Sequence, residues 1–231
     1  MSRRAVRDEA ALEGIRLSGR RWLDLRRRGA VGGSAAHWSL DEMAGRVGEL
    51  SGVGATARLS LAFSLVREAQ GRGEPVVWIS SRESTFFPPD VAAAGVDLEA
   101  LPVIFVPDGA AAARAAERLA RSGAFGLLVL DLAGFPAGPA QDVPAPLQAR
   151  LAGLAQRHEA VVLYLTEKAP DAASLGPLVS LRCQALLEAA EPAAPTVSYA
   201  RWRCRLRVLK DKRRGPGWEH AEMRRAPAGL R

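Results

Sequence analysis

The sequence is poor in the residues that build disulfide frameworks and metal sites, with two cysteines and three histidines in 231 residues. Cys183 and Cys204 lack the spacing of a zinc motif, so neither a structural metal nor a disulfide scaffold is expected. No apolar run approaches the roughly 18 residues of a membrane-spanning helix. The polar first residues lack the apolar stretch of a secretory signal. These features predict a cytoplasmic globular protein without membrane contact.

Acidic residues are scarce at both ends of the chain, so the net charge of +7 is unevenly distributed. Residues 1–30 carry nine arginines against four acids, and residues 201–231 carry eleven basic residues against three acids. The intervening segment, 31–200, carries 12 basic and 18 acidic residues. Basic ends on an acidic body favour contact with a polyanion or an acidic protein face, although arginine-rich ends also serve solubility alone.

Apolar strand patterns alternate with helical patterns through most of the chain. The strand patterns cover residues 47–51, 75–80, 103–106, 127–132 and 160–166, and the helical ones 57–70, 90–95, 108–122 and 146–158. Two further strand patterns, 180–188 and 196–209, follow one another without a helix. This order predicts an α/β fold with a mainly parallel central sheet flanked by helices and with antiparallel C-terminal strands.

The segment between the first strand and the first long helix occupies the position of a phosphate-binding loop. Gly52 matches the first glycine of that loop and Gly54 follows it, but Ala57 replaces the second glycine of the motif and Arg58 stands where the phosphate-binding lysine is expected. Leu59 replaces the hydroxyl that binds Mg²⁺, and Ser60 lies about 100° further round the helix. Taken alone, the segment favours an ordinary strand–turn–helix connection over a working P-loop.

Two acidic residues add to the pattern by their place in the chain. Asp131 ends the most apolar strand, as the Mg²⁺-orienting acid of P-loop NTPases does, although such a residue is often only a turn residue. Glu83 follows the strand 75–80, where it fits either a water-orienting acid or a surface loop. The candidate vestigial nucleotide site therefore consists of Gly52, Gly54, Arg58, Ser60 and Asp131.

Short motifs along residues 39–217 resemble the bacterial RecA core in order and spacing. Ser39-Leu40-Asp41 precedes the loop, and Glu49-Leu50-Ser51-Gly52 leads into it. Further matches are Gly95-Val96-Asp97, the helix end 119–124, the strand 128–131 and Arg207-Val208-Leu209-Lys210-Asp211-Lys212. The resemblance implies that Lys210 and Lys212 reach the nucleotide of a neighbouring subunit; the alternative is a basic strand end.

The departures from RecA set the expected function. The phosphate loop is degraded, and the segments in place of the DNA-binding loops, 132–145 and 167–173, lack the aromatic and basic mixture of single-strand binding. A counterpart of the RecA C-terminal domain is also missing. This combination resembles the ImuA family, whose members take part in damage-induced mutagenesis. It implies a non-catalytic adaptor in the SOS response and translesion synthesis, without ATP or Mg²⁺ as a cofactor.

The ImuA resemblance implies an ImuB-type polymerase homologue and RecA as partners, with single-stranded DNA and self-association as further candidates. Two functions from other classes stay open. One is a DNA-dependent RecA-family ATPase or recombinase, in which Arg58, Asp131 and Glu83 compensate for the missing groups. The other is a regulator such as a SulA-like cell-division inhibitor, which has a RecA-like fold without ATPase chemistry.

Three segments are expected: a basic helical arm and linker at 1–36, a RecA-like core at 37–215 and a basic flexible tail at 216–231. In the arm, Trp22, Leu23 and Leu25 are candidate apolar anchors for a partner or a second copy. In the core, alternate arginines share one face of a strand and form a row for DNA or an acidic partner. These are Arg201, Arg203, Arg205 and Arg207. A solvated sheet edge is the alternative explanation of the row.

Overall fold

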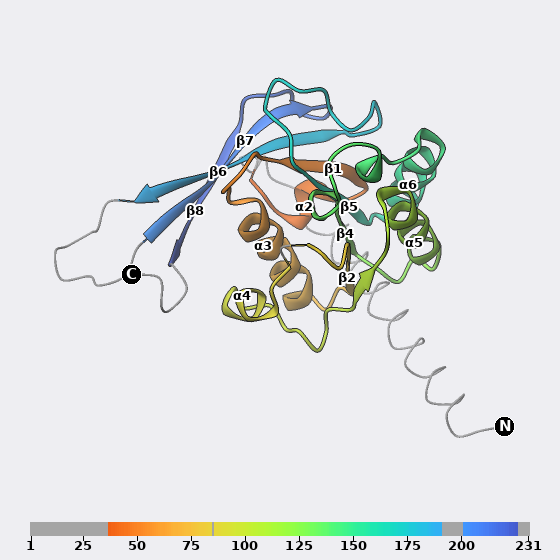
Figure 1. The fold of residues 1–231 in the computed structure, drawn as a ribbon, viewed down its shortest axis with the longest axis horizontal. Helices are drawn as coiled ribbons and strands as arrows, with labels where there is room; N and C mark the ends of the chain where they lie inside the picture. Colours follow the sequence, from red (N-terminus) through yellow and green to blue (C-terminus); the bar gives the residue numbers. More distant parts are fainter. Residues whose placement is uncertain (1–36, 85, 191–200, 226–231) are drawn as a thin grey trace, which may run out of the picture.

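A computed structural model describes residues 37–84, 86–190 and 201–225 of the chain. Its centre is an eight-stranded sheet with the order β3-β2-β4-β5-β1-β6-β7-β8 (Figure 1). The first five strands are β1 (Arg46–Ser51), β2 (Val76–Ser80), β3 (Val103–Phe105), β4 (Leu127–Asp131) and β5 (Val161–Thr166). The other three are β6 (Leu181–Ala190), β7 (Arg201–Asp211) and β8 (Glu219–Arg225).

The parallel part of the sheet confirms the predicted architecture. β4 lies between β2 and β5 and is parallel to both, and β5 is parallel to β1. Every residue of β1, β2, β4 and β5 is buried, as expected for parallel strands covered on both faces. The strand that carries Asp131 is therefore central, and its carboxyl end lies on the same edge of the sheet as the end of β1.

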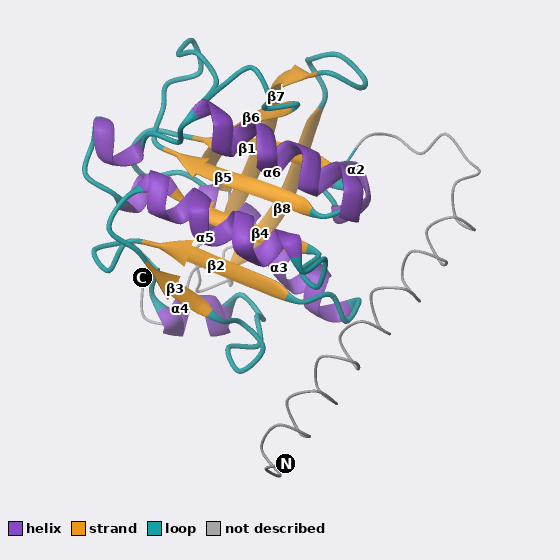
Figure 2. Cartoon of the chain, turned by 90° about the vertical axis from the view of Figure 1, so that its right-hand side faces the viewer, coloured by secondary structure: helices purple, strands orange, loops and turns teal. Residues whose placement is uncertain are grey.

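Helices cover both faces of the parallel strands and form two separate apolar cores (Figure 2). One face carries α2 (Leu40–Met43), α3 (Arg58–Gly71) and α4 (Pro88–Ala93), and the other carries α5 (Gly109–Arg121) and α6 (Ala145–His158). Short 3₁₀ turns, η1 (Leu132–Gly134) and η2 (Pro139–Gln141), lie between β4 and α6. Predicted and observed helices agree to within a few residues at each end.

The C-terminal strands form the expected antiparallel extension, but it is longer than predicted. β6 pairs with β7, and β7 pairs with β8, both antiparallel. The prediction of a flexible tail from residue 216 is wrong for residues 219–225, which form the outer strand β8. The interpretation of β7 as a solvated sheet edge is also wrong, because β7 has a neighbour on each side. The expected arm at 1–36 and the last residues, 226–231, lie outside the described residues.

A buried ion pair fixes this extension to the rest of the sheet. Arg46 Nη2 lies 2.5 Å from Asp211 Oδ1, and both side chains are at most 1% exposed. The Trp218 indole and the Arg213 backbone N–H also donate to Asp211. Burial alone raises the pKa of Asp211, but these donors and the Arg46 charge outweigh it, so the pKa is lowered. The ionised pair therefore joins β1 to the end of β7.

Candidate functional site at the phosphate-loop position

Two glycines shape the loop between β1 and α3. A Cβ added to Gly52 would lie 2.8 Å from the Thr56 methyl carbon and 2.9 Å from its hydroxyl oxygen, so only glycine lets these segments approach. Gly54 has φ +67°, a conformation that favours glycine. The chain thus makes a tight turn at the point where a P-loop would wrap a phosphate, and α3 begins at Arg58.

The Arg58 side chain bonds to the protein's own backbone. Its Nη1 donates to the carbonyl oxygens of Gly52, at 2.9 Å, and Thr166, at 3.2 Å. These carbonyls belong to the segments that follow β1 and end β5, which are neighbouring strands. Nη1 of the guanidinium therefore links the two strand ends, whereas Nε is buried without a hydrogen-bond partner among the described residues.

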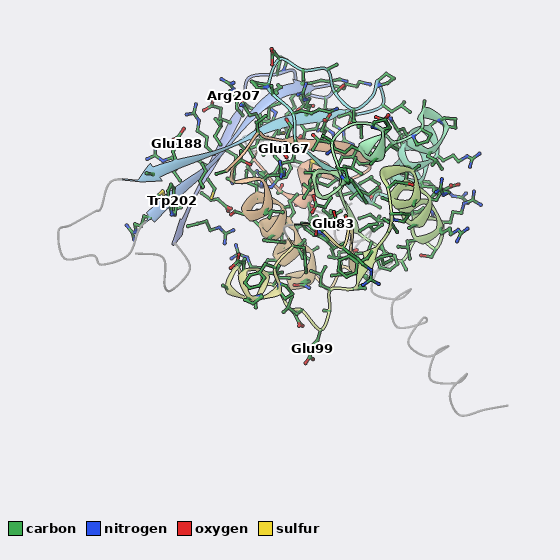
Figure 3. The ribbon with its side chains drawn as sticks, viewed as in Figure 1. Glu83, Glu99, Glu167, Glu188, Trp202 and Arg207 are labelled. Carbon is green, nitrogen blue, oxygen red and sulfur yellow. The ribbon has the colours of Figure 1, made fainter. Side chains whose placement is uncertain are left out.

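An acidic side chain completes this internal arrangement. Glu167 Oε1 accepts a hydrogen bond from the Gly54 backbone N–H at 3.3 Å, and Glu167 lies beside the loop (Figure 3). Backbone N–H groups in such a loop are the donors that bind phosphate oxygens, so a carboxylate on one of them repels an incoming anion. Leu59, at the position of the magnesium-binding hydroxyl, has no side-chain oxygen. The residues present do not fit a magnesium nucleotide as a P-loop holds it.

Ser60 lies near β7 on the α3 face of the sheet. Burial raises the pKa of the Cys204 thiol of β7, and the Ser60 side chain acts on it in the opposite direction. A role for Ser60 in the vestigial nucleotide site stays a prediction.

Asp131 does lie at the predicted place. It is 1% exposed, and Ser80 Oγ donates to its Oδ2 at 3.1 Å. Burial raises the pKa of Asp131, while the Ser80 bond, the positive charge of Arg58 and the Gly134 N–H act in the opposite direction. Asp131 thus lies within the electrostatic reach of the Arg58 charge. Glu83, by contrast, is exposed in the loop after β2.

A buried glutamate, which the sequence suggested only as part of a motif, anchors the loop after β5. Glu49 accepts hydrogen bonds from the Thr166 hydroxyl at 2.9 Å and the Leu175 N–H at 2.8 Å. Arg182, on the adjacent strand, donates to the carbonyls of Ala169 and Ala172. The loop in the position of a DNA-binding loop is therefore held to the sheet from below. A carboxylate in the middle of a buried strand was the available signal.

Lys210 and Lys212 contact this same loop. Lys210 Nζ lies 3.4 Å from the Ser174 hydroxyl, and Lys212 Nζ donates to the Pro177 carbonyl at 2.6 Å. Burial, followed by the charge of Lys212, lowers the pKa of Lys210. Within the chain these lysines therefore support the loop after β5. A role toward a neighbouring subunit's nucleotide stays a prediction.

The four arginines of β7 share one face, as predicted, because the alternating Cys204, Leu206 and Val208 are buried in the core. Arg205 is engaged in ion pairs with Glu188, at 2.9 Å, and Glu219, at 3.0 Å. Arg207 donates to the Gln184 side chain at 2.7 Å. Figure 3 shows the antiparallel strands at the upper left, where Glu188, Trp202 and Arg207 are labelled. The two carboxylates thus offset the charge of Arg205, whereas Arg203 and Arg207 are exposed. The predicted anchors Trp22, Leu23 and Leu25 lie outside the described residues.

Within residues 37–84, 86–190 and 201–225, no three or more histidine, cysteine, aspartate or glutamate side chains are grouped so as to hold a metal ion. In the same ranges, no helix is long and apolar enough to cross a membrane.

Comparison with known structures supports the fold. The chain is similar to a KaiC-like protein from the hyperthermophilic archaeon Pyrococcus horikoshii, with a TM-score of 0.53 and 13% identity. The similarity covers 80% of this chain and 90% of the archaeal one. No protein-family model matches the chain, and no curated protein matches it in sequence. The described part of the chain therefore has a RecA-like α/β fold of the kind found in KaiC-like proteins.

Proposed function

We propose that this protein is a non-catalytic, RecA-like adaptor in damage-induced mutagenesis and translesion DNA synthesis. In this role it binds an ImuB-type polymerase homologue and RecA in the cytoplasm and hydrolyses no ATP. The proposal joins the RecA-like fold to the ordered motifs, from Ser39-Leu40-Asp41 to Lys210-Asp211-Lys212, that resemble the ImuA family.

The observation that carries the non-catalytic part is the use of Arg58. Its Nη1 donates to two backbone carbonyls, of Gly52 and Thr166. Catalysis of phosphoryl transfer depends on cations aimed at the charge that develops on the transferred group. Arg58 supplies little of that stabilisation, because its Nη1 is already bonded to carbonyls, the Glu167 carboxylate lies on the loop, and residue 59 is a leucine without a hydroxyl.

The adaptor part of the proposal is supported by the loop after β5, which lies beside the phosphate-loop position. The loop after β5 is anchored by Glu49 and Arg182, and it lacks the aromatic residues on which bases of single-stranded DNA stack. Protein partners therefore rank ahead of DNA, and the β7 arginine row is a secondary DNA candidate. We place self-association behind both.

A co-purification experiment tests the proposal. The full-length protein is expressed with an ImuB homologue and, separately, with RecA, in the presence and absence of ATP. We expect complexes that need no nucleotide and that survive Asp131→Asn. Single-stranded-DNA-stimulated hydrolysis that Asp131→Asn abolishes would instead establish the ATPase alternative. Absence of both complexes, with cell filamentation on overproduction, would favour a SulA-like inhibitor.

A further inference from the structure

A groove between α5 and α6 lies on the face of the sheet opposite α3. Its volume is about 420 Å³, and its lining residues come only from these two helices: Glu117, Arg121, Arg150, Gly153, Leu154 and Arg157. Figure 2 looks onto this face, where α5 and α6 run side by side. The groove is therefore separate from the phosphate-loop position at the strand ends.

The two helices concentrate positive charge on an otherwise acidic body. Together they hold five arginines, Arg114, Arg118, Arg121, Arg150 and Arg157, and one acid, Glu117. Residues 31–200 as a whole contain 12 basic and 18 acidic residues, so these helices hold five of the 12. Such a local excess attracts an acidic ligand at a surface that the rest of the core would repel.

The single acid of the groove orients two of its arginines. Glu117 lies 2.6 Å from Arg121 and 3.5 Å from Arg150, so it bridges α5 to α6. The hydrogen bond from Arg121 lowers the pKa of Glu117, which stays ionised at neutral pH. The Glu117 side chain is 9% exposed, whereas those of Arg121 and Arg150 are 63% and 59% exposed. The arginines are thus held at the rim with most of their surface open.

The floor of the groove is apolar and contains an unexplained glycine. Leu154 is half-buried, and Gly153 is exposed within the helix α6. Glycine inside a helix destabilises it relative to alanine, yet a Cβ at Gly153 would meet no described atom within 4 Å apart from its chain neighbours and the nearby backbone of α6. Internal packing therefore does not require the glycine. Its effect is to leave open space beside Leu154 at the surface.

We infer that this groove is a docking site for an acidic, amphipathic peptide segment of a partner protein. Apolar side chains of the segment would cover Leu154 and Gly153, and its carboxylates would meet Arg121, Arg150 and Arg157. Nucleic acid fits less well, because phosphates would use the arginines and leave the apolar floor uncovered. The inference concerns a surface remote from the phosphate loop and does not depend on the adaptor role.

The test uses the full-length protein and a fluorescein-labelled helical peptide of glutamate, leucine and alanine, with 14 residues to match α6. Its leucines lie on one face; a scrambled peptide of the same composition is the comparison. Gly153→Leu fills the floor and Arg157→Glu reverses rim charge, while Arg67→Glu on α3 makes the same charge change on the opposite face of the sheet. Circular dichroism checks that each variant is folded.

We expect Gly153→Leu and Arg157→Glu each to weaken binding of the amphipathic peptide at least about tenfold in fluorescence anisotropy, a difference of about 1.4 kcal/mol. Arg67→Glu should stay within about twofold of the wild type. Equal binding of the scrambled peptide, or unchanged binding by folded Gly153→Leu, would overturn the inference. Displacement of the peptide by equimolar single-stranded DNA would overturn it too, in favour of a nucleic-acid surface.

Discussion

The phosphate-loop end of the sheet and the groove between α5 and α6 both carry arginines, but the two regions use them differently. Arg58 gives its hydrogen bonds to two backbone carbonyls, and Glu167 accepts from a loop N–H. Arg121 and Arg150, in contrast, are more than half exposed at the rim of the groove. At the phosphate-loop position, the Arg58 Nη1 and the Gly54 N–H are therefore used in hydrogen bonds within the chain. Exposed arginine side chains lie instead on the helical face formed by α5 and α6.

The largest expected effect on stability concerns Arg46, whose charge is paired with Asp211 inside the protein. Arg46→Met leaves the buried Asp211 carboxylate without its cation, so we expect the free energy of unfolding to fall by about 3–5 kcal/mol. Urea denaturation measures the change. The double variant Arg46→Met/Asp211→Leu removes both charges and should recover a large part of the loss. If Arg46→Met costs less than about 1 kcal/mol, buried pairing does not hold the antiparallel extension.

Arg58→Ala tests the same idea at the phosphate loop. The substitution leaves the Gly52 and Thr166 carbonyls without their donor, so we expect a loss of about 1–3 kcal/mol in urea denaturation. Glu167→Ala, at an exposed contact, should change stability by less than about 0.5 kcal/mol. An Arg58→Ala protein as stable as the wild type would mean that the guanidinium is free for a ligand, and the contrast between the two regions would disappear.

The two buried aspartates should give opposite pH dependences. The pKa of Asp211 is lowered in the folded state, so its stabilisation is present above its ordinary pKa of about 3.9 and is lost as pH falls through the folded value. The pKa of Asp131 is raised, so the folded state binds its proton more tightly and stability falls as pH rises from about 4 toward the folded pKa. Urea denaturation as a function of pH measures both effects.

The matched variants are Asp211→Asn and Asp131→Asn. Asp211→Asn should flatten the acid side of the stability profile. Asp131→Asn should leave stability at pH 7 unchanged or higher, because a buried charge is removed while the contact with Ser80 can persist. A large loss of stability at pH 7 in Asp131→Asn would contradict the upward pKa shift assigned to Asp131.

A small gain in stability is expected in the groove. Gly153→Ala should raise the free energy of unfolding by about 0.5–1 kcal/mol, because alanine favours the helix and its methyl group has open space. Thermal unfolding measures the gain. A loss of stability would show that internal packing requires Gly153, and the glycine would no longer be an argument for a docking site.

Periodicity predicted the fold well because buried parallel strands are continuous apolar runs, as in Leu127–Asp131. It missed β8, because the sequence Glu-His-Ala-Glu-Met-Arg-Arg has no apolar run and is only partly buried. Asp131 was found from its place at the end of a strand. The bonds of Arg58 were not predictable, since one acceptor, Thr166, lies 108 residues away along the chain. The position of Ser60 near Cys204 and the groove at Gly153 likewise depend on tertiary packing.

Nucleotide turnover tests the central claim most directly. The full-length protein is assayed for ATP hydrolysis with Mg²⁺, with and without single-stranded DNA, beside Asp131→Asn and Arg58→Ala. Because Arg58 and Glu167 bond within the chain and Leu59 offers no ligand, we expect the same background rate from all three proteins under both conditions. DNA-stimulated turnover by the wild type that both substitutions abolish would contradict the account.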